Sequence, residues 1–221
     1  MSRETFSSSD SSTTSPESDD AAPAREAAAA TAPKLRADAA RNRGLLLVAA
    51  RDAFTAADDD AAVSLEGIAR AAGVGIGTLY RNFPTREALV EALYRTELDD
   101  VVESAHGLLD GRAAFDALRL WLDRYARFVA TKQGMMPALR AAWSSRAARM
   151  AETRERIEAT IGDLLAAGGA DGSIRPDADA ADTADMLVGV FLAMGDAHDT
   201  RRVGRLLDLI MDALRPAASS R

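Results

Sequence analysis

The stretch VGIGTLYRN brings together small and polar residues whose types and spacing suit contact with duplex DNA. On a helix, Gly75, Gly77 and Thr78 leave an outer face thin enough to enter a major groove about 12 Å wide. Tyr80 and Arg81 add a hydroxyl and a cation, which can reach phosphate oxygens of the DNA backbone. The chemistry that this pattern predicts is hydrogen bonding and ion pairing to DNA.

A helix-turn-helix presents such a face, because it joins two short helices through a tight turn. Ser64 is a suitable N-cap for the first short helix, and Gly73 stands where the chain leaves it, a position that often needs a left-handed backbone. The second short helix is predicted over residues 75–82 and ends before Pro84, since a helix interior does not accept proline. The buried side of the first short helix is predicted to consist of Leu65, Ile68, Ala69 and Ala72.

Apolar residues at helical spacing predict longer helices on both sides of this unit. An earlier helix begins at Ala37, and Thr85 caps a long later helix that ends before Asp110. The apolar stripe of the earlier helix is Leu46, Ala49, Ala50, Ala53, Phe54 and Ala57. Further helices are predicted over residues 115–134, 135–145, 147–167, 180–196 and 201–214, with a loop over residues 168–179. No stretch alternates as a strand does, so we predict an all-α fold.

The domain organisation follows from composition. Residues 1–33 are rich in Ser, Thr, Asp, Ala and Pro, and they offer too little apolar surface to offset the entropy of ordering. We predict that they form a disordered tail and that a chain starting at Pro33 keeps its melting temperature. A helix-turn-helix domain is predicted over residues 34–84, and a second helical domain over residues 85–215.

Charge and composition narrow the function classes. The net charge of −7 argues against a nucleic-acid partner, but Lys34, Arg36, Arg41 and Arg43 cluster ahead of the first apolar stripe. The chain has no cysteine, which removes disulfides, thiolate metal sites and a cysteine nucleophile. Its longest aliphatic run, Leu45–Ala50, is far shorter than the roughly 20 residues of a membrane span. We therefore expect a cytoplasmic protein without a membrane partner.

The stretches LLLVAARDAF and SLEGIARAAGVGIGTLYRNFPTREAL resemble the N-terminal domain of tetracycline-repressor (TetR) family regulators. The resemblance covers about Ala37 to Tyr94 without a gap. It implies a three-helix helix-turn-helix domain, joined by a long fourth helix to an all-helical domain for effector binding and dimerisation. It also implies a sequence-specific DNA-binding regulator that is not an enzyme and needs no cofactor.

The resemblance assigns roles to single residues. It implies that Gly77 and Thr78 face base edges, and that an N-terminal arm carrying Arg41 and Arg43 reaches DNA. Plain surface charges are the alternative interpretation of these two arginines. The family often has Ser and Lys where this chain has Gly75 and Ile76, so phosphate affinity would depend more on Arg81 and the N-terminal arginines. The residues implied to contact backbone phosphates are Ser64, Tyr80, Asn82 and Arg86.

The second domain contains candidates for two further roles. Aromatic and methionine side chains at helical spacing suit either an effector pocket or an ordinary core: Trp121, Tyr125, Phe128, Met136, Trp143, Met186 and Phe191. An apolar stripe on the last helix suits a two-fold interface, because a lone subunit would leave it exposed: Val203, Leu206, Leu207, Ile210 and Leu214. His198 with Asp196 and Asp199 suits a metal ion less well than a solvated capping turn.

These observations lead to one hypothesis and leave two alternatives open. We expect a homodimeric regulator, a repressor that binds a palindromic operator in double-stranded DNA and is released by a small-molecule effector. One alternative is an enzyme with a helical pocket, against which stand two separated histidines and the lack of a phosphate-binding glycine loop. The other is a ligand-binding or adaptor protein that has lost DNA binding, which Gly75, Ile76 and the acidic net charge would permit.

Overall fold

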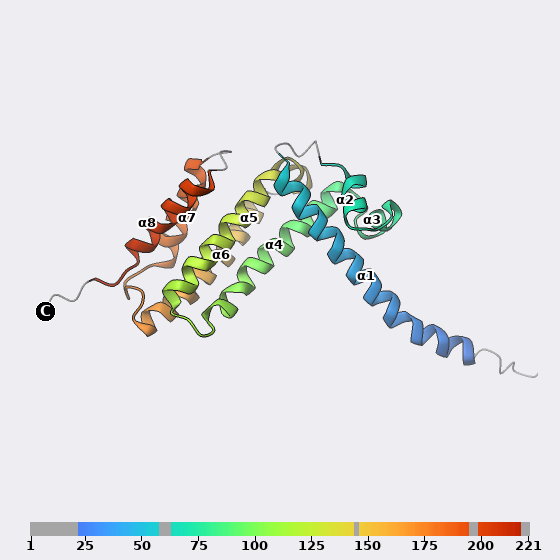
Figure 1. Ribbon diagram of the computed structural model, residues 1–221, viewed down its shortest axis with the longest axis horizontal. Coiled ribbons are helices and arrows are strands. Elements are labelled where there is room, and N and C mark those ends of the chain that lie inside the picture. The colour runs from blue at the N-terminus through green and yellow to red at the C-terminus, as the bar shows by residue number, and fades with distance from the viewer. Residues whose placement is uncertain (1–21, 58–62, 144–145, 195–198, 218–221) are drawn as a thin grey trace, which may run out of the picture. The chain divides into compact units, whose positions relative to one another are not determined.

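A computed structural model describes residues 22–57, 63–143, 146–194 and 199–217. All regular structure in these ranges is helical, which confirms the all-α prediction (Figure 1). The helices are α1 (Ala22–Ala56), α2 (Leu65–Ala71), α3 (Ile76–Asn82), α4 (Arg86–Leu109), α5 (Ala114–Ala142), α6 (Arg146–Asp171), α7 (Ala180–Met194) and α8 (Thr200–Ala213).

The chain divides into two compact units, residues 1–41 and residues 42–221. The described part of the first unit is the beginning of α1, which starts at Ala22 and not at Ala37. Residues 22–33 of the predicted disordered tail are therefore helical, because the run REAAAA consists largely of the residue with the highest helix propensity. The rest of the predicted tail, residues 1–21, lies outside the described residues.

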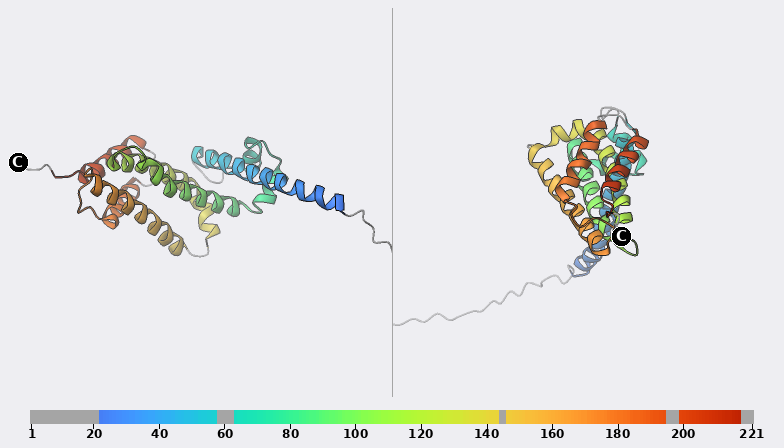
Figure 2. Two further views of the ribbon diagram at one scale, coloured as in Figure 1. Left: turned by 90° about the horizontal axis from the view of Figure 1, so that it is seen from below. Right: turned by 90° about the vertical axis from the view of Figure 1, so that its left-hand side faces the viewer.

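In the second unit, α4 to α8 pack side by side and enclose a continuous apolar core (Figures 1 and 2). α4 and α5 contact each other along much of their length, and α6 lies against both. The core residues of these two helices recur at helical spacing, as the sequence pattern predicts. Fully buried side chains of these two helices include Leu89, Leu93, Leu118, Trp121 and Leu122.

The helix after Asp110 is longer than the sequence predicts. α5 continues through Gly134 and Pro137, where two separate helices were expected. Gly134 lies against the backbone carbonyl of Phe54 in α1, and a β-carbon at this position would overlap that carbonyl. The glycine therefore permits a close approach of two helices and does not mark the end of one.

α6 is also longer than predicted, because it continues through Gly168 and Gly169 to Asp171. The side chain of Ile174 occupies the space that a β-carbon of Gly168 would need, and the Ile174 amide donates to the Gly168 carbonyl over 3.0 Å. The helix ends before Gly172, whose φ of 75° is left-handed. The predicted loop of residues 168–179 is thus shorter and starts at Gly172.

The apolar stripe of the last helix is largely covered by its own subunit. Leu207, Ile210 and Leu214 are buried in the core, and Val203 and Leu206 are partly buried. The expectation that a lone subunit leaves this stripe exposed is therefore wrong. The stripe packs inward because α8 lies against both α5 and α7.

Candidate nucleic-acid interface

The turn between α2 and α3 has the geometry that the sequence predicts. Ser64 caps α2, because its hydroxyl accepts from the Gly67 amide over 3.0 Å. Gly73 adopts a φ of 68°, a left-handed conformation that glycine reaches without strain, and the amide of Val74 then donates to the carbonyl of Ala69 over 3.0 Å. These contacts fix α3 against α2.

The inner side of α3 is anchored in the core. Leu79 and Phe83 are 0% and 1% exposed, and they pack in the same apolar cluster as Ile68 of α2 and Phe54 of α1. Thr85 then caps α4, since its hydroxyl accepts from the Ala88 amide over 3.1 Å. α3 is therefore held on one side only, and its opposite side is exposed and can contact a partner.

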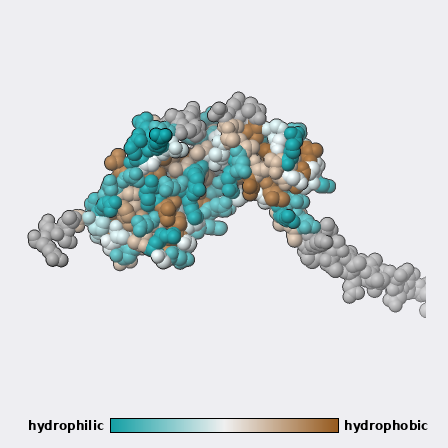
Figure 3. All heavy atoms as spheres, in the orientation of Figure 1, coloured by the Kyte–Doolittle hydropathy of each residue, from teal (hydrophilic) through white to brown (hydrophobic). Residues whose placement is uncertain are grey.

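The outer side of α3 is formed by Ile76, Gly77, Tyr80 and Arg81, all of which are exposed. A β-carbon added at Gly75 or Gly77 would have no neighbour within 4 Å, so this part of the helix has a bare backbone. Figure 3 shows hydrophobic surface over the region of α2 and α3. The shape of this face suits entry into a groove of DNA.

Several of the polar side chains predicted to contact DNA already have partners within the protein. The hydroxyl of Thr78 accepts from Arg81 over 3.0 Å, and the Asn82 amide donates to the carbonyl of Thr78 over 2.9 Å. The hydroxyl of Ser64, besides capping α2, donates to Glu66 over 3.2 Å. Thr78 and Asn82 are also half-buried, so neither lies fully on the outer face.

The side chain of Arg86 connects parts of the helix-turn-helix region to one another. Its guanidinium donates to the carbonyl of Val63 over 2.6 Å and lies 5.3 Å above the ring of Phe54. These two contacts join the start of α4 to the segment before α2 and to α1. The residue was predicted to contact a phosphate, and any such contact would have to compete with these internal ones.

The remaining predicted DNA contacts lie on exposed surface. The hydroxyl of Tyr80, which is 46% exposed, has no partner among the described residues. Arg43 is exposed, with its guanidinium 4.5 Å above the ring of Phe83. Arg41 is exposed as well, and it belongs to the unit of residues 1–41.

Most of the predicted effector residues form a packed aromatic core. Trp121 is fully buried, donates to the carbonyl of Val101 over 3.0 Å and stacks on Tyr125 at a centroid distance of 5.7 Å. Tyr125 continues this packing to Phe128 and Phe191, and burial raises its pKa to about 12. Met136 is half-buried, while Met186 is 41% exposed and therefore does not belong to an enclosed pocket in this subunit.

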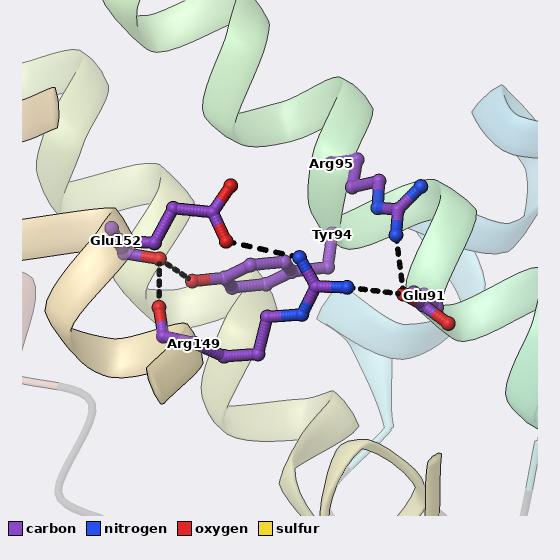
Figure 4. Close-up of polar contacts among 6 residues, drawn as sticks. Glu91, Tyr94, Arg95, Arg149 and Glu152 are labelled. Carbon is purple, nitrogen blue, oxygen red and sulfur yellow. Dashed lines mark hydrogen bonds and ion pairs between the residues drawn. The ribbon is translucent and has the colours of Figure 1, made fainter. Parts of the chain in front are cut away.

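A network of polar contacts joins α4 to α6 (Figure 4). Arg149 of α6 lies 3.3 Å from Glu91 of α4 and 3.0 Å from Glu152. The hydroxyl of Tyr94 lies 2.5 Å from that of Thr153, which in turn donates to the carbonyl of Arg149 over 2.9 Å. Because the single proton of Thr153 is thereby used, Tyr94 is the donor in its own contact with Thr153.

Beside this network lies a cavity of about 250 Å³, which Tyr94, Thr153 and Trp143 help to line. Tyr94 and Trp143 meet edge to face at a centroid distance of 5.1 Å. The indole N–H of Trp143 is buried and finds no acceptor among the described residues. Leaving a buried donor without a partner costs about 1–3 kcal/mol.

A wider groove of about 690 Å³ lies on the other side of α4, between α1, α4 and α5. Phe128 reaches it, and Arg51, Glu97 and Arg127 line it. Burial raises the pKa of Glu97, and the guanidinium of Arg51, 2.5 Å away, opposes this rise. Of the predicted effector residues, only Phe128 and Trp143 line either of these two spaces.

The part of the chain that the structure describes contains no group of three acidic or histidine side chains placed to hold a metal ion. Asp199 caps α8 instead, since its carboxylate accepts from the Arg202 amide over 3.0 Å. Asp196 and His198, the other two residues considered above as ligands of a metal ion, lie outside the described residues. No helix in the described ranges is long and apolar enough to cross a membrane.

Two family models match the chain and together cover most of it. Residues 46–93 match the bacterial regulatory proteins of the tetR family, and residues 113–216 match the C-terminal domain of SbtR-like transcriptional regulators. The first match contains α2 and α3, and the second contains α5 to α8.

Solved structures and a curated protein agree with these matches. The TetR transcriptional regulator SCO0520 of Streptomyces coelicolor is 42% identical, with a TM-score of 0.71 over 80% of this chain and 99% of that one. A TetR regulatory protein of Mycobacterium vanbaalenii is 35% identical, with a TM-score of 0.66 over 82% and 99% of the two chains. An HTH-type transcriptional regulator of Staphylococcus aureus is 32% identical over 68 residues, which are 31% of this chain and only 36% of that protein. The chain belongs to the TetR family of transcriptional regulators, which bind DNA and are not enzymes.

Proposed function

We propose that the protein is a homodimeric repressor that binds a palindromic operator and is released from it by a small-molecule effector. The observation that carries the DNA-binding part is the outer face of α3, where Gly77 and Tyr80 are exposed while Leu79 behind them is fully buried. Arg81 and Arg43 supply cations on exposed surface for phosphate contacts. The acidic net charge of the whole chain does not prevent this, because steering depends on the local arrangement of charges.

The test is a selection of bound duplexes from a random-sequence pool, followed by gel-shift titration of the recovered sequence. We expect a sequence with two-fold symmetry, whose affinity falls steeply with salt because several phosphate contacts release counterions. A variant with Gly77→Glu should lose binding while keeping its fold, since the position is exposed and open. If the wild-type protein selects no sequence, the alternative of a ligand-binding protein without DNA binding is favoured instead.

We propose that dimerisation uses a surface other than the stripe predicted from the sequence. Leu192 of α7 is 77% exposed, Val188 lies one turn earlier on the same face, and Leu209 of the neighbouring α8 is 64% exposed. Exposed leucines on adjacent helices suit pairing with a second copy around a two-fold axis. We therefore assign the interface to this outer face of α7 and α8, and not to the inward stripe of Leu207 and Ile210.

Sedimentation of a double variant, Leu192→Glu with Leu209→Glu, tests this interface. The charges would face their own copies in an apolar contact, so we expect a folded monomer. Val48→Glu is the matched control, because Val48 is 50% exposed but lies on α1. A double variant that still sediments as a dimer would contradict the assignment.

The cavity between α4 and α6 supports the effector part of the proposal. α4 begins at the helix-turn-helix, and the contacts of Glu91 and Tyr94 with α6 hold it in one position. An effector that offers an acceptor to Trp143 would favour a different arrangement of α4 and α6, and a shift of α4 moves α3 relative to the second subunit's recognition helix. An effector can cause release from the operator only if it binds the DNA-free arrangement of the protein more tightly than the DNA-bound arrangement.

A reporter under the selected operator, screened with small neutral aromatic carbonyl compounds, tests this part. Trp143→Phe keeps an aromatic ring but removes the donor, so we expect an active repressor that needs about tenfold more of each inducing compound, the value of one hydrogen bond of about 1.4 kcal/mol. Trp121→Phe is the control, because the Trp121 donor is already satisfied inside the protein. An unchanged response of the Trp143 variant would place the effector elsewhere.

A further inference from the structure

Ile76, the first residue of α3, keeps an aliphatic side chain in solvent although the helix already has a complete inner face. It is 38% exposed, whereas Leu79 on the inner face is fully buried. Isoleucine is among the residues most often buried in proteins. A single exposed aliphatic residue is ordinary in itself, so the meaning of this one depends on its neighbours.

The neighbours leave Ile76 as the prominent feature of the first turn of α3. Gly75 and Gly77 flank it, and a β-carbon at either position would touch nothing within 4 Å. Tyr80 lies one turn later on the same face and is 46% exposed. The first half of the outer face therefore offers methyl groups on a bare backbone, and its hydroxyl and cation lie in the second half, at Tyr80 and Arg81.

Thr78, by contrast, is poorly placed to read a base. Its side chain is half-buried at the edge of the face, and its hydroxyl already accepts from Arg81 over 3.0 Å. The centre of the exposed outer face therefore lies nearer to Ile76 than to Thr78.

An aliphatic side chain can distinguish one feature in the major groove. Thymine alone among the four bases presents a C5-methyl group there, while the other base edges present hydrogen-bond donors and acceptors. We propose that Ile76 packs against the C5-methyl group of a thymine in each half-site and so selects a T·A pair at that position. This inference rests on the proposed function, because it requires α3 to enter the major groove of an operator.

The test removes the methyl group from the DNA and the side chain from the protein, separately and together. Each thymine of one half-site of the selected duplex is replaced in turn by deoxyuridine, which lacks only the C5-methyl group. We expect the wild-type protein to lose about fourfold in affinity at one thymine, the value of burying one methyl-sized group. Ile76→Ala should bind the unmodified duplex more weakly than the wild type and show no difference between thymine and deoxyuridine at that position.

Two further variants make the result specific. Ile76→Val should keep part of the discrimination, since it retains a branched aliphatic side chain. Val48→Ala removes a comparably exposed aliphatic side chain from α1 and should keep the full discrimination between thymine and deoxyuridine. The melting temperatures of the Ile76 variants should match the wild type, because the side chain extends into solvent.

The outcomes separate the inference from the function on which it rests. A wild-type protein that is indifferent to deoxyuridine at every thymine, or a selected half-site without thymine, would overturn the inference and leave the DNA-binding function intact. So would an Ile76→Ala variant that keeps the full discrimination. Failure of the wild-type protein to select any duplex would instead overturn the proposed function.

Discussion

The outer face of α3 and the contact between α4 and α6 each contain a tyrosine, and the two hydroxyls lie in opposite environments. On α3, the hydroxyl of Tyr80 is exposed and has no partner among the described residues. Between α4 and α6, the hydroxyl of Tyr94 is buried and bonded to Thr153, and burial raises its pKa. One tyrosine is available to a partner, and the other holds two helices together.

The comparison indicates where substitutions should affect binding and where they should affect folding. A side chain whose contacts are completed within the protein contributes to stability, and its loss lowers the free energy of unfolding. A side chain that lies in solvent contributes little to stability, so its substitution should affect binding and not folding. Four substitutions test this division.

The largest effect is expected at Trp121, the most completely enclosed of the large side chains. Trp121→Ala should lower the free energy of unfolding by about 3–5 kcal/mol, because it leaves a cavity and removes one of the donors to the Val101 carbonyl. Urea denaturation followed by circular dichroism measures this loss. Tyr80→Ala is the matched control and should stay within about 0.5 kcal/mol of the wild type, as an exposed residue does.

Tyr125 should make stability depend on pH in the alkaline range. Its pKa is about 12 in the folded protein against 10 in the unfolded chain, so the folded state holds a proton that the unfolded state releases between these values. The free energy of unfolding should therefore fall by about 2–3 kcal/mol as the pH rises from 10 to 12. Tyr125→Phe should remove this part of the pH dependence in urea titrations at each pH. An unchanged slope would mean that the phenol is hydrated.

Substitution of Arg86 tests whether its internal contacts or a contact with a DNA phosphate dominates its role. Arg86→Ala should lower the free energy of unfolding by about 1–2 kcal/mol, because the carbonyl of Val63 loses its donor and Phe54 loses the cation above its ring. Thermal melting without DNA measures the effect. An unchanged melting temperature, combined with a salt slope of DNA binding that is smaller by about one, would restore the phosphate role instead.

The smallest effect on folding is expected at the hydroxyl of Tyr80. Tyr80→Phe should leave the melting temperature unchanged and weaken binding to all duplex sequences alike by about tenfold, the value of one hydrogen bond to a charged group. Gel-shift titrations on the selected duplex and on an unrelated one measure the ratio. Equal affinity for the selected duplex with a relaxed base preference would show a base contact in place of a phosphate contact.

The sequence predicted the features that depend on a few neighbouring residues. The caps at Ser64 and Thr85 and the left-handed turn at Gly73 are confirmed, because each is a contact within four residues of the chain. The all-helical class of the fold, and the family, followed from the same local patterns. The helix-turn-helix was therefore the most predictable part of the molecule.

The features that were missed depend on contacts between distant residues. Gly134 was interpreted as a helix end, but its meaning comes from Phe54, which lies on another helix. The periodicity of α8 correctly indicated one buried face, yet it does not tell whether the same chain or a second copy covers that face. In the same way, no pattern of residues shows that the indole N–H of Trp143 lacks an acceptor.

The close approach of α1 and α5 at Gly134 has a consequence for how this sequence can vary. Substitutions at buried positions are usually tolerated when volume is conserved elsewhere, but no compensating change can make room for a side chain against the carbonyl of Phe54, because that neighbour is backbone. Even alanine, which favours helices by about 1 kcal/mol over glycine, would force the two helices apart. In a library of random variants, Gly134 should be as intolerant of replacement as the largest aromatic residue of the core, although it contributes no side chain at all.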